Sequence, residues 1–212
     1  MNTEEVSYLL SQIHKFYPIG LPGLTGFPGE EEYRAIGSNK IDKVISKEST
    51  PWTSLIAKLQ MGCSFRIRDL AHRQFPSYSM EIIFGEQEER GIEIFQKLIL
   101  NVSLLCARFT LFFEDEHRFK NYNTGAGTIP IYTVLSMEQN PLFERQQQFI
   151  HTIKKVVPEY FPDYTFLPHR SLFATDIQGG LPYPALYQDN FPFYTYLFDG
   201  AFTRSESIHI LK

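Results

Sequence analysis

The chain has 212 residues, of which 43% are hydrophobic and 21% charged, a composition that excludes an intrinsically disordered protein. Its formal net charge is −4, and its longest basic cluster is the pair Lys154-Lys155. Because a protein that binds DNA or RNA directly needs a basic face, we expect no direct contact with nucleic acid.

The location of the protein is predicted from what the sequence lacks. The first five residues are followed by no apolar run of the kind that a secretory signal contains. The most apolar stretch, residues 98–113, is interrupted by polar residues such as Asn101, so we expect no membrane span. The two cysteines, Cys63 and Cys106, form no CxxC motif and are expected to be buried thiols in a reducing compartment. These features predict a cytoplasmic protein.

Three helices are expected in the first third of the chain. Apolar side chains recur at helical spacing over residues 3–17 and again over residues 30–46. A third helix is expected to begin after the capping residue Thr50, with Pro51 in its first turn, and to end at Gly62.

The middle of the chain has the pattern of strands. Residues 64–70, 78–84, 93–103 and 106–114 are rich in β-branched and aromatic side chains and are bounded by turn residues. Because no helix separates them, antiparallel pairing is expected. The fourth is apolar on both of its faces, which predicts a central strand.

The last third mixes strands with one long helix. A strand is expected over residues 129–135, and a strongly amphipathic helix near residues 140–157. Short strands are expected at residues 165–167, 193–199 and 207–211.

Together these elements predict a single α+β domain over residues 1–212. Its core is expected to be a single antiparallel sheet of about five to six strands. The N-terminal helices and the long helix near residues 140–157 are expected to cover one side of this sheet.

Acidic residues are grouped in three short runs along the chain. One interpretation places these runs in solvated loops or at helix starts. The other is an acidic surface that steers a basic partner toward the protein. The runs are Glu30, Glu31 and Glu32, then Glu86, Glu88 and Glu89, and finally Glu114, Asp115 and Glu116.

Motifs for catalysis or metal binding are missing from the sequence. The six histidines form no HxH or HExxH pair, and neither a GxSxG elbow nor a phosphate-binding loop occurs. We therefore expect no metal and no cofactor. The most suggestive group is His169 with Arg170, just after a predicted strand, together with Asp176. These three residues define an alternative hypothesis, a hydrolase-type enzyme.

Aromatic residues are abundant, with 19 Phe and 12 Tyr. Phe27 lies in a segment punctuated by Pro and Gly, residues 20–29, and Tyr187 lies in a similar part of the tail. Aromatic side chains in such loops suit a protein-binding face, because they provide large contact area at low entropic cost. They could equally fill a large core.

Four segments resemble small immunity proteins that bacteria make against polymorphic toxins. They are FYPIGLP at residues 16–22, LNVSLL at 100–105 with FTLFFE at 109–114, and YTYLFD at 194–199. The resemblance implies a cytoplasmic protein that is not an enzyme. Such a protein binds a cognate toxin tightly and blocks its active site or the approach of its substrate.

The leading hypothesis is therefore a non-catalytic module that binds a protein such as a basic toxin domain. The hydrolase and a structural subunit of a larger assembly are the alternatives. Neither the identity of the partner nor the oligomeric state follows from the sequence. The residues expected to contact the partner are six carboxylates and two aromatic anchors: Glu86, Glu88, Glu89, Glu114, Asp115, Glu116, Phe27 and Tyr187.

Overall fold

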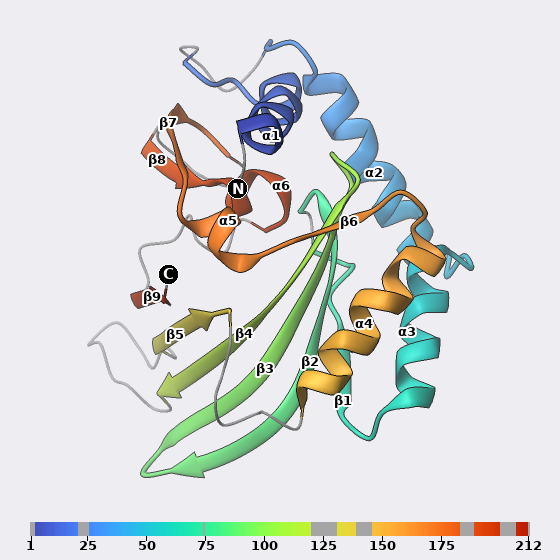
Figure 1. Ribbon diagram of the computed structural model, residues 1–212, viewed down its shortest axis with the longest axis vertical. Coiled ribbons are helices and arrows are strands. Elements are labelled where there is room, and N and C mark those ends of the chain that lie inside the picture. Colours follow the sequence, from blue (N-terminus) through green and yellow to red (C-terminus); the bar gives the residue numbers. More distant parts are fainter. Residues whose placement is uncertain are drawn as a thin grey trace.

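The protein has an α+β fold, seen in a computed structural model that describes residues 3–20, 26–73, 75–119, 131–138, 146–182, 189–199 and 207–211 (Figure 1). The main sheet has the order β1-β2-β3-β4-β5-β9, and β6 pairs in addition with β4. Its strands are β1 (Arg66–Asp69), β2 (Ser77–Glu89), β3 (Ile92–Ser103), β4 (Arg108–Phe119), β5 (Ile131–Met137), β6 (Thr165–Leu167) and β9 (Ser207–Leu211).

The main sheet is mixed, which corrects the expectation of a purely antiparallel one. Strands β1 to β5 pair in sequence order and antiparallel, as expected for strands joined without helices. Strands β6 and β9 run parallel to β4 and β5, because longer connections bring the chain back to them. Strands β7 (Asp176–Gly180) and β8 (Asp189–Pro192) form a second, two-stranded sheet.

The three N-terminal helices are confirmed as α1 (Thr3–Phe16), α2 (Glu30–Ile45) and α3 (Pro51–Gly62). Thr50 and Thr53 cap α3 reciprocally, each side chain bonding the backbone N–H of the other. Gly29 precedes α2 with a φ of 86°, and a Cβ there would lie 1.9 Å from the carbonyl oxygen of Lys15. Only glycine therefore allows α2 to start this close to the end of α1.

Of the expectations for the last third of the chain, one falls partly outside the described residues and one needs correction. The long helix is α4 (Gln147–Tyr160), and the start expected near residue 140 lies outside the described residues. The strand expected over residues 193–199 is wrong, because the segment forms a short helix, α6 (Phe193–Leu197). All five residues of α6 are buried, so its sequence has no polar face from which a helical period could be recognised.

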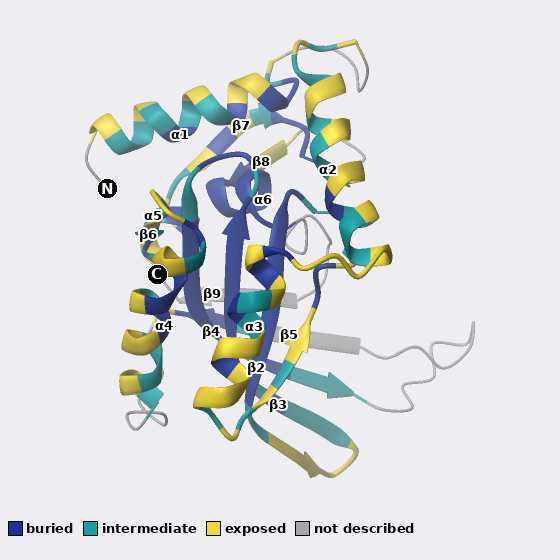
Figure 2. Cartoon of the chain, turned by 90° about the vertical axis from the view of Figure 1, so that its right-hand side faces the viewer, coloured by how far each residue is buried: buried dark blue, intermediate teal, exposed yellow. Residues whose placement is uncertain are grey.

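Helices cover both faces of the main sheet rather than one (Figures 1 and 2). On one face, α3 and α4 pack side chains such as Trp52 and Ile153 against alternate residues of β2 to β4. On the other face, α1, α5 (His169–Phe173) and α6 pack around Ile99 and Phe112. As expected, β4 is central and apolar on both faces over much of its length.

Candidate functional site

One face of strands β2, β3 and β4 is unusually polar for a sheet interior. The opposite face of the same strands carries apolar residues such as Met80, Leu98 and Leu111, which pack against α3 and α4. The polar residues alternate with these along each strand and meet across the strands by register. We call this surface the polar face; its buried members are Ser77, Ser79, Glu81, Lys97, Asn101, Ser103, Thr110 and Glu116, with Glu114 largely buried beside them.

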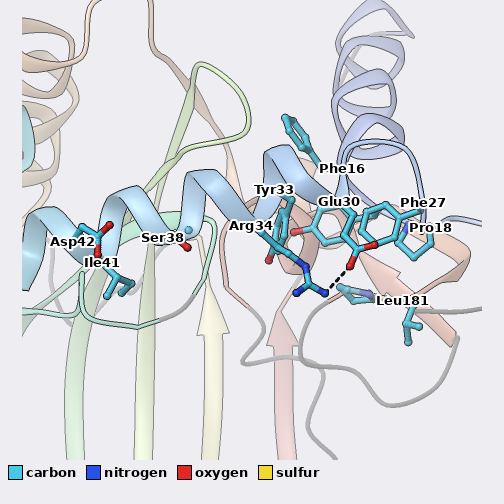
Figure 3. Close-up of a pocket in the computed structure, with 13 residues that line it drawn as sticks. Phe16, Pro18, Phe27, Glu30, Tyr33, Arg34, Ser38, Ile41, Asp42 and Leu181 are labelled. Atoms are coloured by element: carbon cyan, nitrogen blue, oxygen red, sulfur yellow. Dashed lines mark hydrogen bonds and ion pairs between the residues drawn. The ribbon is translucent and has the colours of Figure 1, made fainter. Parts of the chain in front are cut away.

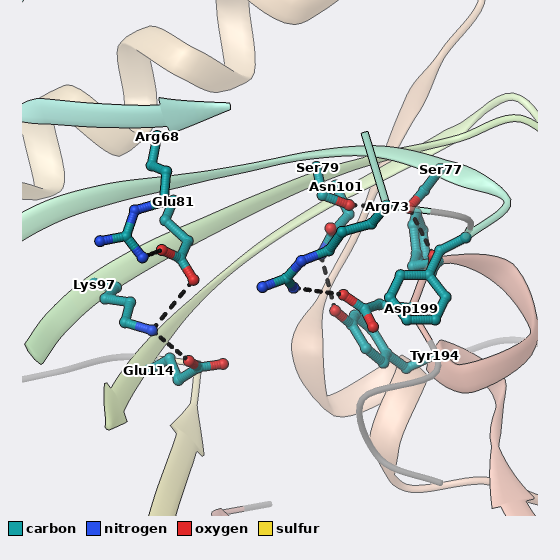
Figure 4. A network of polar contacts seen from close by, with 12 residues as sticks. Arg68, Arg73, Ser77, Ser79, Glu81, Lys97, Asn101, Glu114, Tyr194 and Asp199 are labelled. Carbon is teal, nitrogen blue, oxygen red and sulfur yellow. Dashed lines mark hydrogen bonds and ion pairs between the residues drawn. The ribbon is translucent and has the colours of Figure 1, made fainter. Parts of the chain in front are cut away.

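The part of the polar face that lies under α6 contains only uncharged strand side chains, and we call it the neutral half. Ser77 Oγ donates to the carbonyl oxygen of Phe198 at 2.6 Å, and Ser103 Oγ donates to that of Leu197 at 2.9 Å. Asn101 Nδ2 donates to the hydroxyl of Tyr194 at 3.0 Å (Figure 4). These bonds attach α6 to the sheet and satisfy carbonyl groups at the end of the helix.

The other part of the polar face, the charged half, is centred on Lys97. The Lys97 side chain is 3% exposed, and its ammonium lies 3.2 Å from carboxylate oxygens of both Glu81 and Glu114 (Figure 4). The ammonium also bonds Glu116. Two arginines at the edge extend this network: Arg68 contacts Glu81 at 3.0 Å, and Arg118 contacts Glu116 at 2.9 Å.

The pKa values in the charged half follow from burial and from this pairing. Burial acts to lower the pKa of Lys97, but Glu114, Glu81 and Glu116 outweigh it and raise the pKa above its ordinary value. Burial acts to raise the pKa of Glu116, but Lys97 and Arg118 outweigh it and hold the pKa low. For Glu114 burial prevails, and its pKa is raised. Of these two carboxylates, Glu114 is therefore the one whose charge the network stabilises less.

Beyond the charged half, β2 and β3 continue to an exposed acidic end. Residues 86–89 belong to β2 and are exposed, although they were not expected to be part of a strand (Figure 2). Their backbone pairs with β3 as far as Glu89 opposite Ile92. We call this region the acidic sheet end; its carboxylates are Glu86, Glu88, Glu89 and Glu93.

The acidic residues predicted to bind a partner thus divide into two groups. Glu86, Glu88 and Glu89 are exposed at the acidic sheet end. Glu114 and Glu116 belong to the buried ion-pair network and do not form an open surface. Asp115 points to the opposite face of β4 and is half-buried, and its pKa is raised by burial, with His117 opposing the shift. The fourth carboxylate of the acidic sheet end, Glu93, is half-buried and lies 3.6 Å from Arg118. Neither Glu93 nor the central Lys97 was singled out from the sequence. A lysine inside a predicted buried strand was the available signal, since it requires a carboxylate partner.

Of the two predicted aromatic anchors, the one that the structure describes does not adjoin the acidic residues. Phe27 is half-buried just before α2 and lines a cavity there. Helix α2 begins at the end of the molecule far from the acidic sheet end (Figure 1). Tyr187 lies outside the described residues.

The residues of the hydrolase hypothesis are not brought together. His169 is completely buried, whereas Arg170 and Asp176 are exposed. The Nε2 atom of His169 lies 2.8 Å from Ser136 Oγ, a pair that resembles a nucleophile and its base. Both side chains are 0% exposed, and burial lowers the pKa of His169 to about 4. This histidine is a neutral member of the core, packed between the rings of Phe112 and Phe173.

The cysteines differ in burial. Cys106 is buried as expected, and burial raises the pKa of its thiol to about 11. Cys63 is only half-buried.

In the described ranges of the chain, no group of three or more His, Cys, Asp or Glu side chains could hold a metal ion. Nor does any helix in those ranges have the length and apolar character needed to cross a membrane.

No protein-family model, curated protein or solved structure matches this chain. The best-defined functional feature is therefore geometric: exposed carboxylates at the end of a long, paired hairpin whose base is fixed by the Lys97 network.

Proposed function

We propose that this chain is a non-catalytic protein-binding module, an immunity protein of the bacterial cytoplasm that binds and neutralises a basic toxin. The observation that carries the proposal is the acidic sheet end. Within residues 86–93, this end contains four glutamates and one arginine, Arg90. Such a concentration of one charge at an exposed end attracts a basic protein and orients its approach.

The acidic sheet end is held rigidly enough to recognise a partner. Strands β2 and β3 pair almost without interruption from Ser77 opposite Ser103 to Glu89 opposite Ile92. The Lys97 network and the hydrophobic contacts of β2 to β4 fix the base of this hairpin. A pre-ordered hairpin loses little conformational freedom on binding, so more of the interaction energy contributes to affinity.

The ion pairs of Glu86 and Glu89 at this end are exposed to solvent. Arg66 contacts Glu86 at 2.6 Å, but both side chains are about half exposed. Arg90 is 89% exposed and lies 3.8 Å from Glu89. Exposed pairs of this kind contribute about 0–1 kcal/mol, so cations of a partner can replace them at little cost. In a nuclease toxin, the glutamates would occupy the groups that otherwise bind nucleic-acid phosphates.

The experiment that tests the proposal uses the native host of the protein. The tagged chain is co-expressed with the polypeptide encoded directly upstream, and the purified pair is analysed by light scattering and calorimetry. We expect a stoichiometric complex in which the partner's toxic activity is lost. Its affinity should fall at least about tenfold between 50 and 500 mM NaCl, because the contact is electrostatic. A lone monomer with no effect on the partner's activity, or a complex insensitive to salt, would contradict the proposal.

A further inference from the structure

A cavity of about 600 Å³ lies along α2 (Figure 3). Helix α2 begins at the end of the molecule opposite the acidic sheet end (Figure 1). The volume of the cavity is within the range of small-molecule sites. Helix α2 lines it from Glu30 to Asp42, a length of about 18 Å at 1.5 Å per residue. The wall around the first turn of α2 is aromatic and contains Phe16, Phe27 and Tyr33.

The aromatic wall is fixed by buried contacts. Tyr17 is 5% exposed, and its hydroxyl donates to the carbonyl oxygen of Tyr196 at 2.6 Å. The ring of Tyr33 packs on that of Tyr17 with centroids 5.3 Å apart. This end of the cavity is thus pre-formed, as in most ligand sites.

The centre of the cavity lies beside a glycine. Gly37 lies in the middle of α2, and a Cβ added there would meet no atom of another part of the described chain within 4 Å. A glycine inside a helix costs about 0.5–1 kcal/mol relative to alanine. No close contact requires glycine at this position, and the space beside it is open, so a larger side chain there would extend into the cavity.

The charges of the described lining residues favour a cation. Glu30 is already neutralised, because it contacts Arg34 at 2.5 Å and accepts a hydrogen bond from the backbone N–H of Gly26. The remaining charge is the exposed carboxylate of Asp42, one turn beyond Ser38, which no described group pairs with.

From this arrangement we propose that the cavity binds a small organic cation, consisting of an aromatic or aliphatic body and a protonated amine. The body lies over Gly37 between the side chains of Tyr33 and Ile41, and the ammonium group contacts Asp42. This site is independent of the protein-binding proposal, because it lies at the opposite end of the molecule and uses other residues.

The test compares three probes that share one apolar body: 4-phenylbutylamine, 4-phenylbutanol and 4-phenylbutyrate. Each is titrated into the ¹⁵N-labelled full-length protein, and amide shifts of residues 29–42 are followed. We expect a Kd of about 1 mM for the amine, from its size. One exposed ion pair should make the amine bind about threefold tighter than the alcohol and the carboxylate correspondingly weaker.

Three variants locate the site. Gly37→Leu fills the cavity and should abolish binding of the amine while leaving the thermal midpoint unchanged or higher. Ala35→Leu adds the same bulk at an exposed position of α2 that does not line the cavity, and should bind as the wild type does. Asp42→Asn should reduce the affinity for the amine to that for the alcohol. If Gly37→Leu does not fold, Ser38→Leu provides the same test from the neighbouring lining position.

The proposal is overturned if the carboxylate binds as tightly as the amine, or if none of the probes binds at concentrations up to about 20 mM, which is well above the expected Kd. Unchanged binding in Gly37→Leu would overturn it too. Any of these results leaves the acidic sheet end and its partner unaffected, so the two proposals fail separately.

Discussion

The neutral and charged halves of the polar face lie on the same three strands, yet they bury polar groups in different ways. In the neutral half, single hydroxyl and amide groups bond to backbone carbonyls and a tyrosine of α6 and its end. In the charged half, three carboxylates surround one ammonium, with arginines at the margin. Uncharged groups can be buried with one or two bonds, whereas a buried charge needs several partners.

This difference explains where each half lies. The neutral half supports α6, and its hydroxyl and amide groups find partners there without contact with water. The charged half lies where β2 and β3 leave the body of the protein, so its margins, Arg68 and Arg118, keep contact with water. The strands can therefore continue into an exposed acidic end, with one shift of register between Ile83 and Gly85. We infer that the charged half is the support of the acidic sheet end.

The largest effect is expected in Lys97→Met. This change leaves three largely buried carboxylates without their common ammonium, and should lower the free energy of unfolding at pH 7 by about 3–5 kcal/mol. Urea unfolding measures it. The loss should diminish toward pH 4, where carboxylates become protonated, and Lys97→Arg should lose less. A loss under about 1 kcal/mol at pH 7 would mean that the network is not a buried one.

Next in size is the acid sensitivity caused by His169. The unfolded chain takes up a proton on this side chain near pH 6.5, whereas in the folded protein its pKa is about 4. The stability that the neutral imidazole provides is therefore lost as the pH falls from about 6.5 to about 4, by on the order of 3 kcal/mol. In urea unfolding, the difference between wild type and His169→Gln should narrow over this range. A constant difference would show that His169 is not held neutral.

A smaller effect, without pH dependence, is expected in the neutral half. Ser103→Ala removes the donor to the carbonyl of Leu197 and the acceptor of the Leu105 N–H, so it should cost about 1–3 kcal/mol. The cost should be the same at pH 5 and pH 8, because no charge is involved. A cost that changes between these two pH values would contradict the distinction between the halves.

Within the charged half, Glu116→Gln and Glu114→Gln remove the same charge but should change the stability of the protein differently. Glu116→Gln should destabilise the protein at pH 7, because its lowered pKa means that the fold favours its ionised form. This contribution is lost as the pH falls through the folded pKa. Glu114→Gln should be neutral or stabilising at pH 7, because its raised pKa means that the fold disfavours its charge. Equal losses in the two variants would refute this assignment.

The elements predicted well from the sequence have signals confined to a few neighbouring residues. Thr50 and Pro51 defined the start of α3, and apolar periodicity defined α1 and α2. Local sequence signals failed where the length of a strand depends on the strand with which it pairs. Strand β2 was expected to end near residue 84, but its pairing with β3 extends it through four exposed residues as far as Glu89. Glutamate has low intrinsic preference for strands, so a local reading stops too early.

The candidate site was predicted only in part for the same reason. The acidic runs were visible in the sequence, but their division into exposed and buried groups depends on strand register. Lys97 opposite Glu114, and Glu93 opposite Glu88, become neighbours only when three strands are aligned. The position of Phe27 far from these residues likewise follows from the tertiary fold, not from any local pattern.

The most direct test of the central claim is a matched charge reversal measured as affinity for the partner. Glu88→Lys lies at the acidic sheet end, and Glu31→Lys makes the same change at an exposed position of α2. Both should leave stability within about 0.5 kcal/mol of the wild type. We predict that Glu88→Lys weakens the complex by at least about tenfold and that Glu31→Lys changes it by less than about twofold. Equal effects of the two substitutions, or a larger effect of Glu31→Lys, would contradict the assignment of the acidic sheet end as the binding surface.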